Sequence, residues 1–283
     1  MELSFSLNYL EKVRGSKMRR DFSEMVALCR DAGFRYVDYT PDFQAPDFAE
    51  KAYRDREILD AAGIEVEQTH APMNRYRTYP DERFGEYYKN AFEASKIVGA
   101  KYVVVHGDEY RVTDRYDERE IQDFAYDFLA PYVDYAKKNG MAVAIENLFE
   151  DHCFPEVNGR SRFTSTAGEL KGLIERFNDP SVGCCWDFGH AACAFGTDKM
   201  LSALMEMGSC ICCTHVHDNY YGKDLHVSPF LGDIDWESHM KHLKTIGYKG
   251  KFSFELVYGS YPDALIGKWL KHIYEVGEYL VSL

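Results

Sequence analysis

Four short apolar stretches of the chain each end at a side chain that could bind a metal ion. Residues 211–216 form an apolar run rich in β-forming residues, and His217 follows it directly. Glu146, Asp187 and Glu255 come at the ends of three similar runs. Three carboxylates and one imidazole are ligands that a divalent cation accepts. The sequence therefore predicts a metal site built from these four side chains.

Further titratable side chains lie near the ends of the same or neighbouring apolar runs. They are His70, His106, His190, Asp224 and His226. A single histidine at such a position is more often structural, but their joint occurrence predicts that they bind the substrate or additional metal. Asn147 follows Glu146 directly, and we expect its amide to orient the ligands rather than to react.

Side chains this far apart in sequence can share a site only if the fold brings the run ends together. The chain repeats one unit eight times, an apolar run followed by an amphipathic helix, and most helices stop at a glycine such as Gly33 or Gly63. Parallel strands need a helical crossover, and eight units can close into a barrel. We therefore predict an α/β protein with a single (β/α)8 TIM barrel domain over residues 1–283, in preference to an open doubly wound sheet.

In such a barrel, active sites collect at the carboxyl ends of the strands. The expected strands cover residues 3–8, 36–40, 65–72, 102–107, 142–148, 182–190, 210–219 and 251–258. Residues two positions before an inward-facing ligand also face inward, which predicts Ala144, Cys185, His215 and Ser253 in the barrel interior. The longest irregular stretch, residues 150–165, is expected to lie over the mouth of the barrel.

The composition weighs against several classes of function. A net charge of −13 is unfavourable for a nucleic-acid partner, because nucleic-acid binders neutralise phosphates with Lys and Arg. The chain has no apolar run long enough to span a membrane and no secretory signal pattern, so we expect a cytoplasmic protein without a membrane partner. The eight cysteines do not form a disulfide framework or a metal-binding motif, and we expect reduced thiols.

Several short motifs follow one another in a diagnostic order. They are AIENL, WDFGH, HVHDN, the pattern D-x-H-x-x-P-x-x-G-x-I-D-W over residues 224–236, and FELVY. In this order they resemble the xylose isomerase-like TIM barrels, and specifically the sugar phosphate isomerase/epimerase group, over essentially the whole chain. The resemblance implies that Glu146, Asp187, His217 and Glu255 bind Mn, Mg, Co or Zn. It also implies that His190 contacts a small carbohydrate substrate.

The same resemblance implies a mechanism. A divalent cation can hold two adjacent sugar oxygens and polarise a carbonyl, which makes the neighbouring C–H acidic. Glu146 and Glu255 would then be the catalytic residues, one removing the proton and the other returning it through an enediolate. The expected reaction is epimerisation or aldose–ketose isomerisation of a sugar or sugar phosphate.

The chain departs from the ketohexose 3-epimerases, which it otherwise resembles. Those enzymes have a second glutamate six residues after the first ligand, where this chain has His152, and an arginine shortly after the metal histidine, which this chain lacks. Ketohexose epimerisation is therefore doubtful. Four arginines in the expected mouth loops could bind a substrate phosphate or carboxylate, or could be solvated charges. They are Arg75, Arg77, Arg160 and Arg162.

Three other functions remain open from the sequence. The chain resembles the zinc-dependent apurinic-site endonucleases, whose trinuclear zinc ligands match the types of His70, His106, Glu146, Asp187, His190, His217, Asp224, His226 and Glu255. The acidic balance and the loop over residues 224–236 argue against this class. A lyase acting on an inositol-derived ketone needs the same polarised carbonyl. A barrel that binds sugar or metal without turnover is the non-enzymatic alternative, and a homo-oligomer is also open.

Overall fold

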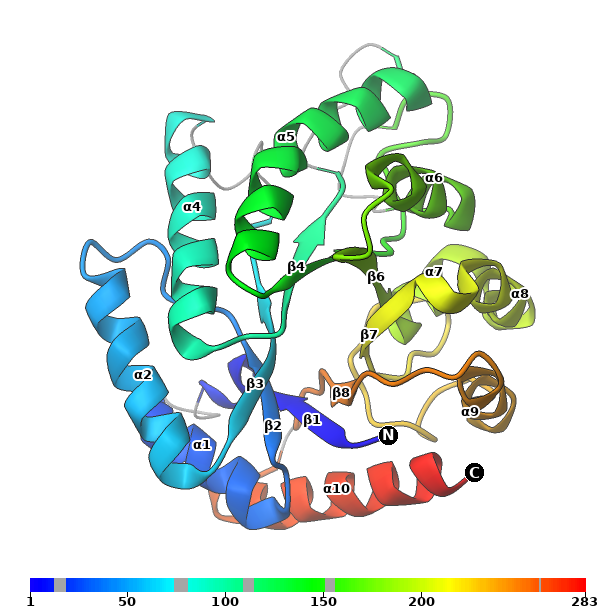
Figure 1. The fold of residues 1–283 in the computed structure, drawn as a ribbon. Helices are drawn as coiled ribbons and strands as arrows, with labels where there is room; N and C mark the ends of the chain where they lie inside the picture. The colour runs from blue at the N-terminus through cyan, green and yellow to red at the C-terminus, as the bar shows by residue number, and fades with distance from the viewer. Residues whose placement is uncertain (13–18, 74–80, 109–114, 151–155, 260) are drawn as a thin grey trace.

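Eight parallel strands form the centre of the protein in the computed structural model, which describes residues 1–12, 19–73, 81–108, 115–150, 156–259 and 261–283. The strands are β1 (Leu3–Ser6), β2 (Tyr36–Tyr39), β3 (Glu65–His70), β4 (Tyr102–His106), β5 (Ala142–Glu146), β6 (Val182–Asp187), β7 (Ile211–His215) and β8 (Phe252–Phe254). They are arranged in the order β7-β6-β5-β4-β3-β2-β1-β8. A parallel bridge between Val216 and Phe254 joins the two ends of this order. The TIM barrel fold expected from the sequence is confirmed (Figure 1).

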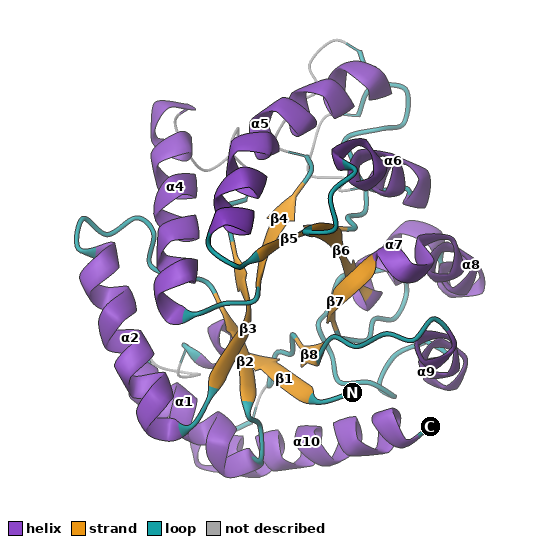
Figure 2. Ribbon diagram, in the orientation of Figure 1, coloured by secondary structure: helices purple, strands orange, loops and turns teal. Residues whose placement is uncertain are grey.

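Helices surround the strands, as the colouring by secondary structure makes clear (Figure 2). They are α1 (Phe22–Ala32), α2 (Phe48–Ala62), α4 (Asp81–Val98), α5 (Glu118–Lys138), α6 (Ala167–Phe177), α7 (Phe188–Phe195), α8 (Thr197–Met207), α9 (Trp236–Thr245) and α10 (Ile266–Ser282). Short 3₁₀ helices cover Leu7–Leu10 (η1), Gly208–Cys210 (η2) and Asp263–Leu265 (η3). Among the described residues, no helix combines the length and the apolar character that crossing a bilayer requires.

Local sequence signals set the helix ends. The carboxylate of Asp21 accepts a hydrogen bond from the backbone N–H of Ser23 and caps α1, which ends at Gly33 in the left-handed region at φ 116°. Thr166 caps α6 by accepting from the N–H of Glu169. The Glu169 side chain binds Arg160 and Tyr116 instead of returning to the cap, so only one of the two bonds of a capping box forms.

Alternation along the strands separates the barrel interior from the outer core. Val104, Ala144, Cys185 and Cys213 pack together as one small buried cluster, apart from the large cluster that contains the other strand residues and the helices. These small side chains fill the interior of the barrel below its mouth. The polar residues that follow each of them by two positions therefore stand at the carboxyl end.

The structure differs from the predicted elements at strands six and seven. β7 ends at His215, four residues before the expected end at residue 219, and Val216 forms an isolated bridge with Phe254. α7 begins at Phe188, directly after Asp187, although the strand was expected to continue to residue 190. His190 therefore lies in a helix, and His217 lies beyond the end of β7.

Candidate metal centre

A cavity of about 380 Å³ opens at the carboxyl ends of the strands. This is the size range of small-molecule sites. Its wall includes His70, His106, Glu146, His190, His215 and Glu255, which come from strand ends or the residues just beyond them. Each strand of a parallel barrel delivers its last residue to the same rim, so the topology explains how these distant positions meet.

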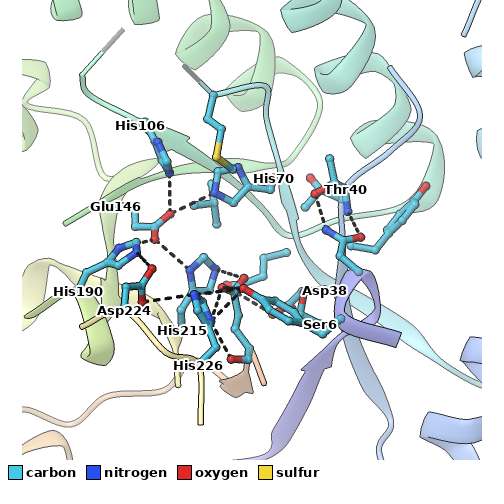
Figure 3. A pocket seen from close by; sticks show the side chains of 18 of the residues that line it. Ser6, Asp38, Thr40, His70, His106, Glu146, His190, His215, Asp224 and His226 are labelled. Atoms are coloured by element: carbon cyan, nitrogen blue, oxygen red, sulfur yellow. Dashed lines mark hydrogen bonds and ion pairs between the residues drawn. The ribbon is translucent and has the colours of Figure 1, made fainter. Parts of the chain in front are cut away.

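Glu146, the last residue of β5, is the centre of a ring of imidazoles (Figure 3). Its Oε2 lies 3.1 Å from His70 Nε2 and 3.2 Å from His106 Nε2. Its Oε1 lies 3.1 Å from His190 Nδ1 and 3.3 Å from His215 Nδ1. Each carboxylate oxygen therefore serves two histidines.

Asp187, Glu255 and His215 form the adjoining part of the site. Asp187 is fully buried at the end of β6, and its Oδ2 lies 3.7 Å from His215 Nδ1. Glu255 follows β8 directly, and its Oε1 lies 3.5 Å from His215 Nε2. One ligand atom from each of the three residues fits within 4.8 Å of the others, as the ligands of one ion must.

The structure places His217 differently from the sequence prediction. His217 Nε2 lies 3.1 Å from Asp187 Oδ1, and its ring stacks on His226 at a centroid distance of 3.8 Å. Its candidate metal partners are Asp224 and His226, whereas His215 stands among Glu146, Asp187 and Glu255. Both histidines face the same side of the chain by alternation. His215 lies 3.3 Å from Glu146, 3.7 Å from Asp187 and 3.5 Å from Glu255, which makes it the alternative to His217 as a ligand beside these three carboxylates.

The remaining predicted site residues form two further groups of possible ligands. His70, His106 and Glu146 make one group, and His217, Asp224 and His226 make another. His190 joins Glu146 and Asp187. All nine positions named from the sequence thus line or border one cavity, and two of the groups share Glu146.

Buried amides and carboxylates hold the ligands in place. Asn147 Nδ2 donates to the backbone oxygen of Asp187 at 2.9 Å, and Asn147 Oδ1 accepts from the Asp187 N–H at 2.7 Å. These two bonds tie the end of β5 to the end of β6.

Asp218 organises the loop that carries Asp224 and His226. Its carboxylate accepts hydrogen bonds from the Trp236 indole at 2.8 Å and from the backbone N–H groups of Phe230 and Ile234. Its backbone pairs with Val227. The motif over residues 224–236 therefore supplies three of the hydrogen-bond donors that hold this loop to Asp218.

Neighbouring imidazoles and carboxylates of the site shift one another's pKa. Burial raises the pKa of Glu146, but the charge of His215 and hydrogen bonds from His106 and His190 outweigh it and hold that pKa well below its usual value. Burial lowers the pKa of His190, but the charge of Asp187 and a bond with Glu146 raise it to about 10. Protons on the imidazoles thus compensate the carboxylates. A cation with imidazole and carboxylate ligands would replace those protons, so the residues fit a divalent metal.

The described part of the mouth loop is anchored by ion pairs. Arg162 Nε donates to Asp108 Oδ2 at 2.7 Å, and both side chains are buried. Arg160 binds Glu150 and Glu169 at 2.7 Å. Arg160 is therefore engaged in holding the loop, while Arg162 also lines the cavity. Arg75, Arg77 and His152 lie outside the described residues.

Sequence reasoning missed three residues that the structure brings to the site. His215 was recognised as inward-facing but not as a ligand. Asp108 lies 3.7 Å from His106 Nδ1 through its Oδ1, and no motif marked it. Tyr9 reaches the cavity from η1, and its hydroxyl contacts Glu255. Only the position of Tyr9 just after the first strand could have indicated it.

The family model for the xylose isomerase-like TIM barrel matches residues 26–276. The chain belongs to this family. The match confirms the resemblance carried by the ordered motifs, and it covers the elements that supply every candidate ligand of the site.

Individual relatives are distant. The chain is 24% identical to the y4fM protein of Sinorhizobium fredii over 81% of this chain and 78% of that one. It is also 24% identical to the inosose isomerase of Bacillus velezensis, over 100% of this chain and 98% of that one.

Solved structures share the fold. The zinc-bound IOLI protein superposes with a TM-score of 0.77 at 20% identity, covering 100% of this chain and 98% of that chain. D-psicose 3-epimerase in the presence of D-fructose also gives 0.77, at 13% identity over 99% of both chains.

Proposed function

We propose that the protein is a divalent-cation-dependent isomerase or epimerase that moves a proton on the carbon next to a sugar carbonyl. One observation carries this proposal. Two carboxylates flank the same imidazole, with Glu146 Oε1 3.3 Å from His215 Nδ1 and Glu255 Oε1 3.5 Å from His215 Nε2. Two carboxylates on opposite sides of one binding centre can remove and return a proton on the two faces of a bound carbon.

The cation would be held by one set of ligands at the strand ends. That set is Glu146, Asp187, His215 and Glu255. When bound, a divalent cation supplies polarisation of the substrate carbonyl, which lowers the pKa of the adjacent C–H.

The chain's own residues then perform the proton transfer. Glu255 is the group we assign to proton removal, because its side chain is 15% exposed and that of Glu146 is 3% exposed. Glu146, at the end of β5, would return the proton. His190 and Asp224 line the same cavity and provide partners for substrate hydroxyls.

The relatives support a polyhydroxylated ketone as the substrate class. An inosose isomerase is among the relatives, and a ketose epimerase is among the structures of the same fold. Because identity is low and the chain departs from the ketohexose 3-epimerase pattern, the test uses a panel of ketoses, ketose phosphates and inososes.

The experiment measures exchange of solvent deuterium into each substrate with added Mn²⁺. Wild type is compared with Glu255→Gln and with Glu275→Gln, a control on the exposed face of α10. We expect wild type and the control to introduce deuterium, and Glu255→Gln to be slower by about 10²- to 10⁴-fold. An unchanged exchange rate in Glu255→Gln would remove this residue from the mechanism. Loss of water from an inosose would instead assign dehydration.

A second candidate function is phosphodiester hydrolysis, favoured by one observation. Two further groups of possible ligands border the first, His70 with His106 and Glu146, and His217 with Asp224 and His226. Adjacent cations can stabilise both the attacking and the leaving oxygen of a phosphodiester. The net charge of −13 disfavours a nucleic-acid substrate. Cleavage of an abasic-site oligonucleotide together with three tightly held zinc ions per chain would establish this function instead.

A further inference from the structure

The Tyr9 hydroxyl contacts Glu255 and His226, which belong to two different groups of possible metal ligands. Tyr9 follows β1 directly, within η1, and lines the cavity. Its hydroxyl oxygen lies 3.2 Å from Glu255 Oε2 and 2.9 Å from His226 Nδ1. The rings of Tyr9 and His226 also contact each other at a centroid distance of 5.0 Å. The hydroxyl has a single proton to donate, so its direction depends on what each partner can accept.

The surroundings of His226 direct that proton to Glu255. His226 Nδ1 lies 2.9 Å from the backbone oxygen of Glu255, which can only accept a hydrogen bond. Nδ1 therefore carries a hydrogen and cannot accept from Tyr9. His226 Nε2 lies 3.3 Å from the Tyr9 hydroxyl and 3.4 Å from Asp224 Oδ1, an oxygen to which it can donate. The Tyr9 hydroxyl accordingly donates to Glu255 Oε2.

The two oxygens of Glu255 consequently have different partners. Oε1 lies 3.5 Å from His215 Nε2, on the side of the Asp187 and His215 ligand group. Oε2 is held by Tyr9. A carboxylate oxygen has two lone pairs, so Oε2 keeps one for a substrate proton while the other accepts from Tyr9.

We infer that Tyr9 is a positioning residue that keeps Glu255 bound to the cation through Oε1 alone and aims Oε2 at the substrate. This inference rests on the proposed function. Without the hydroxyl, the carboxylate is free to turn and bind the cation through both oxygens. Such a change leaves the cation in place but removes the oxygen that takes the proton.

Tyr9→Phe tests the inference, with Tyr248→Phe as the matched control. The Tyr248 hydroxyl also makes a hydrogen bond, to the backbone oxygen of Lys251 at 2.7 Å, but this bond lies at the opposite end of the barrel. In Tyr9→Phe we expect kcat for deuterium exchange to fall by about 10- to 100-fold, the loss of one hydrogen bond to a charged group, with KM within about threefold. The control should keep the wild-type kcat.

The second readout is the visible absorption spectrum of the Co²⁺-loaded protein, which reports the coordination of the ion independently of turnover. We expect a weaker absorption in Tyr9→Phe, as a second Glu255 oxygen joins the ion, and a wild-type spectrum in the control. A wild-type kcat and spectrum in Tyr9→Phe would overturn the inference alone. Failure of the wild-type protein itself to bind Co²⁺ or to exchange deuterium would overturn the proposed function and this inference together.

Discussion

Asp187 Oδ1 lies 3.1 Å from His217 Nε2, and both side chains are completely buried. His217 Nε2 also lies 3.2 Å from Asp187 Oδ2, the oxygen that faces His215 Nδ1 at 3.7 Å. The two histidines therefore contact Asp187 differently, His217 closely through both oxygens and His215 through a longer contact with Oδ2. His215 is a ligand of the proposed cation, while His217 supports Asp187 from behind.

The first prediction separates these two histidines. His215→Ala should weaken Mn²⁺ binding by more than about 100-fold, since it removes a ligand, whereas loss of a supporting group as in His217→Ala should cost about 10- to 100-fold. Titration calorimetry on chelator-treated protein measures both affinities. A larger loss of Mn²⁺ affinity in His217→Ala than in His215→Ala would instead support His217 as the ligand, as the sequence predicts.

Cation binding should become tighter as the pH rises. The pKa of His190 is raised to about 10, and the pKa of His215 is also raised, so both imidazoles carry protons in the cation-free protein near neutral pH. A cation needs the neutral imidazole, and binding must therefore release protons. Acid favours the protonated, cation-free form, and the apparent Kd for Mn²⁺ should fall steadily from about pH 6 to about pH 9.

Calorimetry in buffers of different ionisation enthalpy counts the protons released on binding. His190→Gln should release fewer protons than wild type, because the substitution removes one of the groups that titrate. An affinity independent of pH would contradict the proton exchange between histidines and cation.

Gly189 should tolerate no side chain. A Cβ at this position would lie 1.7 Å from His217 Cε1, and His217 is buried without room to move. An alanine normally stabilises a helix relative to glycine, but here the clash should dominate and Gly189→Ala should lower the free energy of unfolding by about 1–3 kcal/mol. Gly168→Ala is the control, since a Cβ there meets nothing within 4 Å. Urea unfolding compares the two, and equal stabilities would contradict the packing.

The Arg162–Asp108 pair should be important for the stability of the mouth loop. Both side chains are buried, so Arg162→Met should cost about 3–5 kcal/mol by leaving the Asp108 carboxylate without its partner. Adding Asp108→Asn should recover part of that loss, since the uncompensated charge is removed. A double-mutant cycle by urea unfolding gives the coupling energy, and additive effects would contradict a direct interaction.

Much of the fold could be predicted because each unit carries its own local signals. The glycines that end α1 and α2 and the apolar runs between helices specify alternating strands and helices, and eight such units close a barrel. The choice between His215 and His217 could not be predicted in this way. Alternation places both on the same face, and what distinguishes His215 is its contacts with Glu146 and Glu255, which come from other strands.

Contacts that span the whole chain were equally inaccessible to sequence reasoning. Tyr9 and Glu255 meet because β1 pairs with β8 in register, with Phe5 beside Phe254. Neither residue has a local pattern that points to the other. The side chains of Asp108 and Arg162 meet because they follow β4 and β5, which pair with each other.

Glu255 stands just beyond β8, the last strand of the barrel. During translation, Glu146, Asp187 and His215 therefore leave the ribosome well before Glu255, the fourth proposed ligand. An ion captured by the nascent chain would be held by an incomplete set, and full retention must await the docking of the final strand against β1. A chain that stopped before β8 would lack one of the four proposed ligands and also the strand that pairs with β1.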